Sequence, residues 1–144
     1  MKTVLLVEDN EDDVFFMETA VQEHRMRVNL RIARTGDEAV DYLSGRGNYT
    51  NREAFPLPNV VITDIKMPGK TGHELLQWVR SHETLHRLPV LMLSSSNQAV
   101  DVNLAYDYGA NSYLHKPMAH QELQETVGMA INYWLKANVP PQPE

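Results

Sequence analysis

The sequence predicts a single α/β domain in which helices cover both faces of a parallel sheet. Five short apolar segments alternate with five segments of helical periodicity along the 144 residues. Such alternation is typical of parallel strands joined by right-handed helical crossovers. The segment "TVLLV" at 3–7 is almost entirely apolar, as expected of a strand buried on both faces. We expect strands at 3–7, 28–32, 59–63, 89–93 and 112–115, and helices at 10–24, 35–45, 71–82, 97–109 and 120–137.

Capping signals mark the starts of three helices. Asn10 is the expected N-cap of the first helix. Thr35 with Glu38, and Thr71 with Glu74, have the spacing of capping boxes, in which threonine and glutamate each accept a backbone N–H of the other. Apolar residues at helical spacing define the faces that should pack on the sheet. These are Val14, Met17 and Val21 in the first helix, and Leu123, Val127, Ala130, Ile131 and Trp134 in the last.

Several segments need a separate interpretation. The strand at 28–32 alternates apolar and polar residues, so we expect it at an edge of the sheet. Residues 97–109 fit a strand or a helix, but their length and final glycine favour the helix. The connection at 44–58 is long and polar, and it is either functional or a tolerated surface insertion. We expect one domain at 1–137, then a short flexible tail at 138–144 and no effector domain.

Composition excludes several classes of function. The chain has no cysteine, so it contains no disulfide and no thiolate metal site. A net charge of −6 without a basic stripe argues against nucleic-acid binding. The apolar start of the chain is too short for a signal peptide or a membrane-spanning segment. We therefore expect a cytoplasmic protein that binds neither nucleic acid nor membrane.

Acidic, hydroxyl and lysine side chains follow the predicted strands. The carboxyl ends of parallel strands share one edge of a sheet, and ligands bind outside that edge. Glu8 and Asp9 follow the first strand, and Asp64 follows the third. The fourth strand ends in the three serines at 94–96, and the fifth ends in Lys116. We therefore expect three carboxylates, a hydroxyl cluster and a lysine at one site.

Charge balance at this edge points to a metal and a phosphoryl group. Three clustered carboxylates repel one another unless a cation joins them. Oxygen ligands without histidine or cysteine suit Mg²⁺, and phosphoryl transfer depends mainly on charge neutralisation and positioning. Asp64 ends a central strand just before the turn at 67–69, so it is the expected attacking group. Each feature alone has an ordinary explanation, such as acidic residues at a helix start. Their joint occurrence at four strand ends favours a site.

The motifs that carry these residues resemble a known family. "LLVEDN", "VVITDIKMPGKTG", "PVLMLSSS" and "GANSYLHKP" occur in the order found in receiver domains of two-component response regulators. The spacings of 30 residues from Asp64 to Ser94 and 22 from Ser94 to Lys116 also fit. The long connection and "NYWLKANVPP" resemble the stand-alone regulators that serve bacterial phytochromes. The resemblance implies a flavodoxin-like (βα)5 fold, a doubly wound parallel sheet with strand order 2-1-3-4-5 and five helices on two faces.

The resemblance implies which residues bind a metal. Asp64 is the expected phosphoacceptor, and it shares a Mg²⁺ (or Mn²⁺) ion with Asp9. The backbone carbonyl of Lys66 completes the ligands that the protein supplies. Glu8 acts on the metal through water.

The resemblance also implies a phosphoryl-binding group and a switch. Lys116, Ser94 and Ser95 are expected to bind the phosphoryl oxygens, and the Lys116–Pro117 peptide bond is expected to be cis. After phosphorylation, Ser94 moves toward the new charge and Tyr113 occupies the space it leaves. We expect this movement to reshape the face formed by the fourth helix, the fifth strand and the fifth helix.

The expected function is a phosphorylated switch and not an enzyme. Its expected partner is a sensor histidine kinase, for which a phytochrome-type kinase is the candidate. The resemblance also implies a homodimer through the switch face. Tyr106, Met129 and Tyr133 are expected to be exposed on the outer surface, which suggests an interface. A degenerate receiver that binds its partner constitutively stays open as an alternative. An aspartate-nucleophile phosphatase is disfavoured because Lys66 stands where such enzymes carry a general acid, and a flavin module because "EDNEDD" would repel the phosphate.

Overall fold

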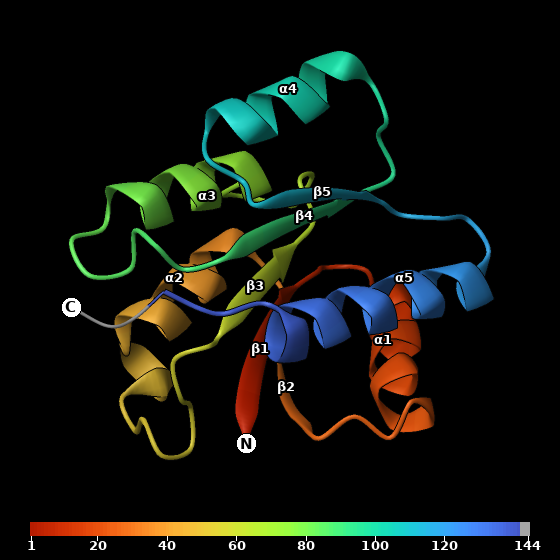
Figure 1. The fold of residues 1–144 in the computed structure, drawn as a ribbon. Coiled ribbons are helices and arrows are strands. Elements are labelled where there is room, and N and C mark those ends of the chain that lie inside the picture. The colour runs from red at the N-terminus through yellow and green to blue at the C-terminus, as the bar shows by residue number, and fades with distance from the viewer. Residues whose placement is uncertain (142–144) are drawn as a thin grey trace.

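The protein is described here by a computed structural model covering residues 1–141. Five parallel strands form one sheet in the order β2-β1-β3-β4-β5, which confirms the expected topology (Figure 1). The strands are β1 (Lys2–Val7), β2 (Val28–Ala33), β3 (Val60–Thr63), β4 (Val90–Ser94) and β5 (Ser112–His115). The helices are α1 (Glu11–Glu23), α2 (Gly36–Ser44), α3 (Gly72–Ser81), α4 (Ala99–Asp107) and α5 (His120–Asn132). The predicted tail at 138–144 lies partly outside the described residues.

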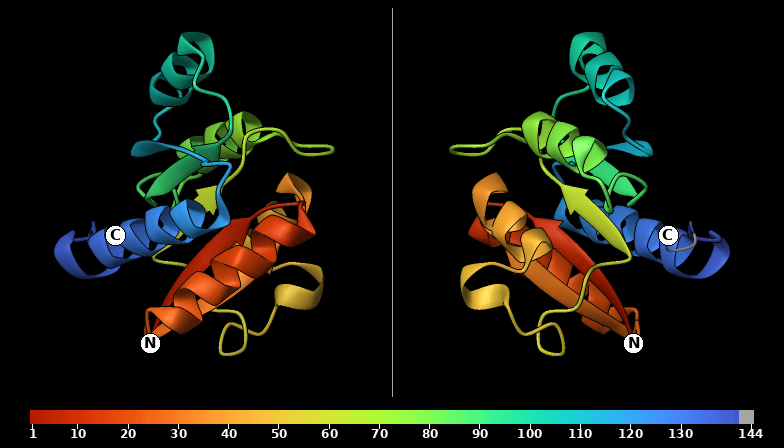
Figure 2. Two further views of the ribbon diagram at one scale, coloured as in Figure 1. Left: turned by 90° about the vertical axis from the view of Figure 1, so that its right-hand side faces the viewer. Right: turned by 90° about the vertical axis from the view of Figure 1, so that its left-hand side faces the viewer.

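Helices cover both faces of the sheet. The two side views show α1 and α5 on one face and α2 and α3 on the other (Figure 2). Side chains of the central strands alternate between two cores: Leu5 and Val61 pack with α2 and α3, whereas Leu6 and Ile62 pack with α1 and α5. Because both faces are covered, β1, β3 and β4 are buried almost throughout. β2 lies at an edge and is half-buried, as its alternating sequence predicted.

One predicted capping box forms only in part. The Thr35 hydroxyl oxygen accepts the Glu38 backbone N–H at 3.0 Å, as expected. The Glu38 carboxylate instead accepts the Arg34 backbone N–H at 3.2 Å and the Tyr49 hydroxyl at 2.8 Å. A partner brought in by the following connection therefore competes for the glutamate, which the local spacing could not reveal. The other predicted caps, Asn10 and the Thr71–Glu74 box, are confirmed.

The long connection after α2 packs back onto that helix. It contains a short 3₁₀ helix, η1 (Gly47–Tyr49). Arg52 donates to the carbonyl oxygens of Tyr42 and Leu43 at 2.7 and 2.8 Å, which satisfies acceptors at the end of α2. Tyr49 packs on Tyr42 in a tilted arrangement and Phe55 packs edge-to-face on it, with ring centroids 5.0 and 6.1 Å away. These contacts give the connection a structural role in covering α2.

The structure decides the ambiguous segment at 97–109 and shortens the last predicted helix. Residues 97–109 contain α4, so the helical alternative is correct. The last predicted helix is divided, because α5 ends at Asn132 and a π-helical turn, η2 (Tyr133–Ala137), follows. Lys2 Nζ donates to the carbonyl of Leu135 at 2.5 Å within this turn and ties it to the start of β1. Within residues 1–141, none of the helices combines the length and apolar character needed to cross a membrane.

Candidate functional site

An open cleft lies at the carboxyl ends of β1, β3, β4 and β5. Strand order places β3 between β1 and β4, so Asp64 lies at the centre of this edge. The backbone ladder continues past the strands: the Asp64 N–H donates to Val7 at 3.0 Å, and the Lys116 N–H donates to Ser94 at 2.7 Å. Glu8 is buried beneath the cleft. Of the residues expected from the sequence, Asp9, Asp64, Lys66, Ser94, Ser95, Lys116 and Pro117 line it.

Gly72 fixes the backbone that follows the central strand. Its N–H donates to the carbonyl of Ile65 at 2.8 Å, so the start of α3 lies directly against the end of β3. A Cβ atom on Gly72 would lie 2.1 Å from the carbonyl oxygen of Asp64. Only glycine allows this approach, and the turn therefore holds Asp64 rigidly at the mouth of the cleft.

The Lys116 ammonium contacts three carboxylates. Its Nζ donates to Glu8 Oε1 in a short ion pair, and it lies 3.1 Å from both Asp64 Oδ2 and Asp13 Oδ2. The Lys116 side chain is only 11% exposed, so the solvent screens these contacts weakly. An ammonium has three N–H donors, and three carboxylate oxygens are available to accept them. Glu8 and Asp13, from two other segments, thus hold Lys116 beside Asp64.

Asp13 is the member of this group that the sequence interpretation missed. A signal for it existed: Asp13 lies four residues before Met17, which was placed on the buried face of the helix. The Asn10 side chain accepts the Asp13 backbone N–H at 3.0 Å, so the helix cap also fixes the backbone position of Asp13. The resemblance between motifs gave Asp13 no role, because it lies outside "LLVEDN".

Burial shifts the proton affinities of the pair at the base of the cleft. Loss of water around Glu8 raises its pKa from 4.5 to about 7, a shift that the Lys116 contact only partly opposes. Burial lowers the pKa of Lys116, but its hydrogen bond to Glu8 and the charges of Asp64 and Glu8 outweigh that effect, so the pKa is raised overall. Lys116 is therefore a permanent cation in this cleft.

The acidic group fits a hard divalent cation. One carboxylate oxygen from each of Glu8, Asp9 and Asp64 lies within 4.8 Å of the others. Two oxygens on opposite sides of Mg²⁺ are about 4.2 Å apart, so a small adjustment or one bridging water joins this set. Glu8 Oε1 already contacts Lys116 and Glu8 Oε2 accepts the Asp9 N–H at 3.1 Å. Both oxygens of Glu8 therefore already have partners, as do those of Asp64, whose Oδ1 accepts the Ile65 N–H at 2.7 Å.

The loop after β4 links the cleft to α4 and β5. Ser94 is buried and its Oγ accepts the Ser96 N–H at 3.1 Å, whereas Ser95 is exposed. Ser96 Oγ donates to Asp101 Oδ2 on α4 at 2.5 Å. The Tyr113 hydroxyl on β5 donates to the Ser96 carbonyl at 2.7 Å. Ser96, the last serine of the expected hydroxyl cluster, therefore connects Ser94 to Tyr113 and to Asp101, which the sequence did not single out.

One expected feature is wrong for this structure. Among residues 1–141 no peptide bond is cis, so the Lys116–Pro117 bond is trans. A prolyl bond prefers trans by only about 0.5–1 kcal/mol, and the motif alone therefore does not fix the isomer. With this trans peptide bond the Lys116 side chain already reaches Asp64.

Lys66, two residues after Asp64 in the sequence, is exposed at the rim of the cleft.

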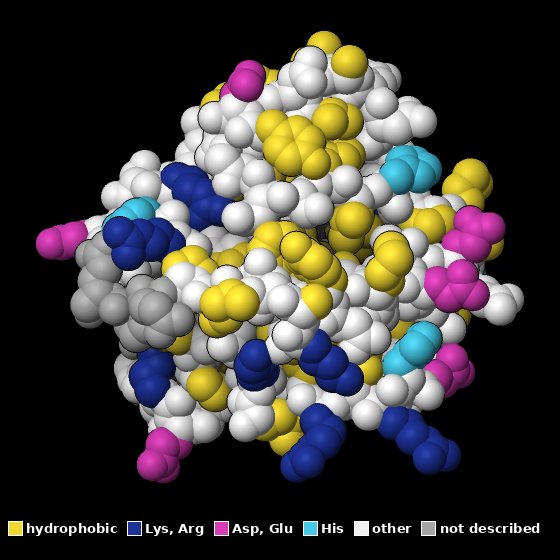
Figure 3. Space-filling model, viewed as in Figure 1, with side chains coloured by type: hydrophobic (Ala, Val, Ile, Leu, Met, Phe, Trp, Pro, Cys, Tyr) yellow, Lys and Arg dark blue, Asp and Glu magenta, His cyan; other side chains and the backbone are white. Residues whose placement is uncertain are grey.

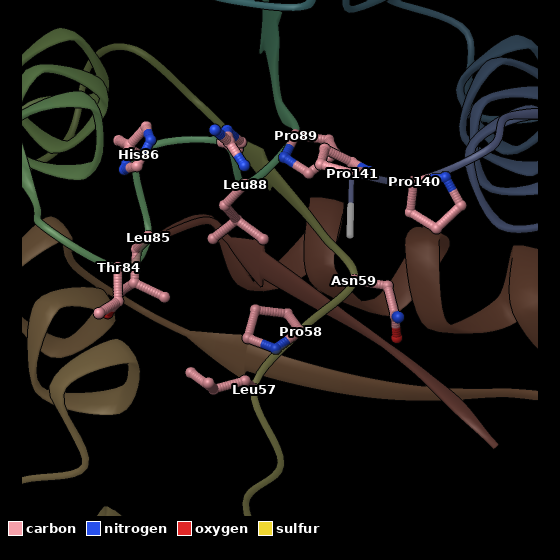
Figure 4. A pocket seen from close by; sticks show the side chains of 11 residues that line it. Leu57, Pro58, Asn59, Thr84, Leu85, His86, Leu88, Pro89, Pro140 and Pro141 are labelled. Carbon is pink, nitrogen blue, oxygen red and sulfur yellow. The ribbon is translucent and has the colours of Figure 1, made fainter. Parts of the chain in front are cut away.

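Two other cavities lie at the opposite edge of the sheet. One is bordered by residues that precede β3 and β4, with Pro140 and Pro141 of the C-terminal segment beside it (Figure 4). The other lies between the starts of β1 and β2 and the end of α5. Neither lining includes a carboxylate. The acidic cleft is therefore the candidate site.

The parallel five-stranded fold and its acidic cleft define a receiver-type domain. Residues 4–128 match the response regulator receiver domain family, and the chain belongs to this family of two-component signalling proteins. It is 31% identical over 135 residues to the response regulator Rcp1 of Synechocystis, covering 94% of this chain and 90% of Rcp1. The family match therefore agrees with the acidic cleft at the carboxyl ends of the strands.

Solved structures of response regulators share the whole fold. The phosphorylated cyanobacterial phytochrome response regulator RcpA is 31% identical, with a TM-score of 0.90 and coverage of 98% of this chain and 99% of RcpA. The response regulator RPA3017, described in red light signaling of R. palustris, is 29% identical, with a TM-score of 0.91 and 99% coverage of both chains. The Mn²⁺-bound form of Rcp1 has a TM-score of 0.88, 30% identity and coverage of 99% and 100%.

Proposed function

We propose that this protein accepts a phosphoryl group on Asp64 from a sensor histidine kinase in a Mg²⁺-dependent reaction. The observation that carries the proposal is the Lys116 ammonium, 3.1 Å from Asp64 Oδ2, in a cleft that also holds Asp9. Membership of the receiver family supports the reaction class. The phosphorylated RcpA and the Mn²⁺-bound Rcp1 structures support phosphorylation and metal binding in this group of proteins.

In the proposed reaction, an Asp64 carboxylate oxygen forms a bond to phosphorus while the phosphorus–nitrogen bond of a phosphohistidine donor breaks. The imidazole leaves with the electron pair of that bond and then takes a proton. Lys116 neutralises one phosphoryl oxygen, and Ser94 and Ser95 supply hydroxyl and backbone donors to the other phosphoryl oxygens. Mg²⁺ held by Asp9, Asp64 and the Lys66 carbonyl, with Glu8 acting through water, would neutralise further charge as it develops.

The partner that we propose is a phytochrome-type histidine kinase. Two of the most similar solved structures are regulators that act with phytochrome or red-light signals. Met118, which lines the cleft, and Phe15 on the neighbouring helix α1 are exposed apolar side chains. Exposed apolar side chains of this kind suit contact with a protein donor better than with a small phosphate ester.

The output that we propose passes through the face of α4, β5 and α5. Hydrophobic side chains gather across the region of these elements in the space-filling view (Figure 3). Tyr106, Met129 and Tyr133 are 50%, 65% and 53% exposed, respectively, in agreement with the expectation from the sequence. Tyr113 lies between the cleft and this face, because its hydroxyl contacts Ser96 and its N–H donates to the Tyr106 hydroxyl at 3.2 Å. This face would form a homodimer that responds to phosphorylation.

Charged substitution should weaken such a dimer. We expect Met129→Arg to raise the dimer dissociation constant at least about tenfold, because a desolvated like charge would face its copy across a two-fold axis. Sedimentation velocity of the wild type and the variant, with and without phosphorylation, measures this. Leu57→Arg is the matched control, since Leu57 is exposed on a distant connection. An equal dissociation constant for wild type and Met129→Arg would reject this face as the interface.

Intact mass is the direct test of phosphorylation. We expect the wild type to gain one phosphoryl group from acetyl phosphate or phosphoramidate when Mg²⁺ is present, and to gain none after chelation. Asp64→Asn should gain none under either condition, because its amide nitrogen and oxygen are poor nucleophiles. Asp12→Asn, at an exposed position of α1, serves as the control for loss of one acidic group. Failure of the wild type with small donors and with a histidine kinase would favour the degenerate receiver that binds constitutively.

A further inference from the structure

We infer that Asp13 is a positioning residue that keeps the Lys116 ammonium at Asp64 when the metal engages Glu8. This inference rests on the proposed phosphorylation of Asp64. The contact that carries it is Asp13 Oδ2 to Lys116 Nζ at 3.1 Å, the same distance as the contact between Lys116 and Asp64. The Asp13 and Lys116 side chains are 21% and 11% exposed, respectively, so this charge-assisted hydrogen bond is partly shielded from solvent.

The three acids around Lys116 differ in what else they must do. Glu8 has both oxygens engaged, one by Lys116 and the other by the backbone N–H of Asp9. A cation bound at the Glu8, Asp9 and Asp64 cluster would draw on Glu8 and weaken its pairing with Lys116. Asp64 changes its charge and shape when it is phosphorylated. The contacts of Lys116 with Glu8 and with Asp64 are therefore both altered during the reaction.

Asp13 keeps its contact through these changes. It belongs to the first turn of α1, and not to the group of three carboxylates within 4.8 Å of one another. Its backbone is fixed by the Asn10 cap, and α1 packs on the sheet through Val14 and Met17. A rigid helix thus presents one carboxylate to Lys116 that neither the metal nor the phosphoryl group occupies. This arrangement leaves two ammonium protons for the phosphoryl oxygens.

Removal of Asp13 should loosen Lys116 without removing its charge. We expect Asp13→Ala to slow phosphorylation by phosphoramidate about tenfold at saturating Mg²⁺, the loss expected for one charge-assisted bond. Asp13→Asn keeps an acceptor oxygen and should recover part of that rate. Asp12→Ala, which removes the neighbouring exposed acid of the same turn, should keep the wild-type rate. Thermal unfolding of each variant shows whether it is folded.

A direct readout of the ammonium separates positioning from a structural role. Lys116 Nζ–H signals in ¹H–¹⁵N spectra report exchange with water, and they need no phosphorylation. With Mg²⁺ and beryllofluoride bound, we expect this exchange to be at least about tenfold faster in Asp13→Ala than in the wild type, and unchanged in Asp12→Ala. Unchanged exchange in Asp13→Ala would overturn the inference, and so would faster exchange with a wild-type rate of phosphorylation. A wild type that shows the protected ammonium but never gains a phosphoryl group would instead reject the proposed function.

Discussion

Lys116→Met is expected to stop phosphorylation almost completely and to destabilise the protein. Lys116 is the cation shared by Glu8, Asp13 and Asp64, and methionine keeps much of its volume without its charge. Removing one partner of a buried ion pair costs about 3–5 kcal/mol, because the other charge is left in a poor solvent. The Glu8 side chain is only 2% exposed, so it bears most of this penalty.

Two measurements check this prediction. Phosphoramidate labelling at saturating Mg²⁺ should slow at least about 100-fold, and urea unfolding at pH 8 without divalent cations should show a loss of about 3 kcal/mol. Glu8 can take up a proton, so the loss should be smaller at pH 5.5. Lys66→Met removes an equal charge from the exposed rim of the same cleft and should change stability little. Equal unfolding free energies for Lys116→Met and Lys66→Met at pH 8 would contradict the ion-pair account.

Glu8 is expected to make the metal-free protein less stable as the pH rises. Its folded pKa of about 7 lies above the unfolded value of 4.5, so the folded state binds the proton more tightly. The stability that the protonated group contributes is fully present below pH 4.5 and is lost as the pH rises through 7. A shift of this size corresponds to a loss of about 3 kcal/mol between these limits.

Glu8→Gln isolates this effect, since glutamine does not titrate. We expect the free energy of unfolding of the wild type, relative to Glu8→Gln, to fall by about 3 kcal/mol between pH 4.5 and pH 8 in the presence of a chelator. Glu11→Gln is the control, because Glu11 is an exposed acid at the start of α1. Adding Mg²⁺ at pH 8 should restore stability to the wild type more than to Glu8→Gln. A constant difference between wild type and Glu8→Gln across this pH range would exclude a buried, proton-binding Glu8.

Local patterns determined much of the fold. The almost wholly apolar β1 predicted its burial between two helical layers, because a central parallel strand has no face left for polar residues. The alternation of β2 predicted its place at the edge of the sheet. Where a tertiary partner intervened, the local pattern failed: Tyr49 and the backbone of Arg34 occupy the Glu38 carboxylate, and the Thr35 capping box stays half-formed.

The chain by itself determined which side chains could meet at the acidic cleft. The sequence shows where strands end, and parallel strands bring their carboxyl ends to one edge of the sheet, so the sequence alone groups Asp9, Asp64 and Lys116. Only the tertiary structure decided how they pair. Packing of α1 on the sheet brought Asp13 to Lys116, and burial at the strand ends raised the pKa of Glu8. The Asp13–Lys116 distance and the burial of Glu8 depend on many weak packing contacts between distant segments, and no short stretch of sequence determines these contacts together.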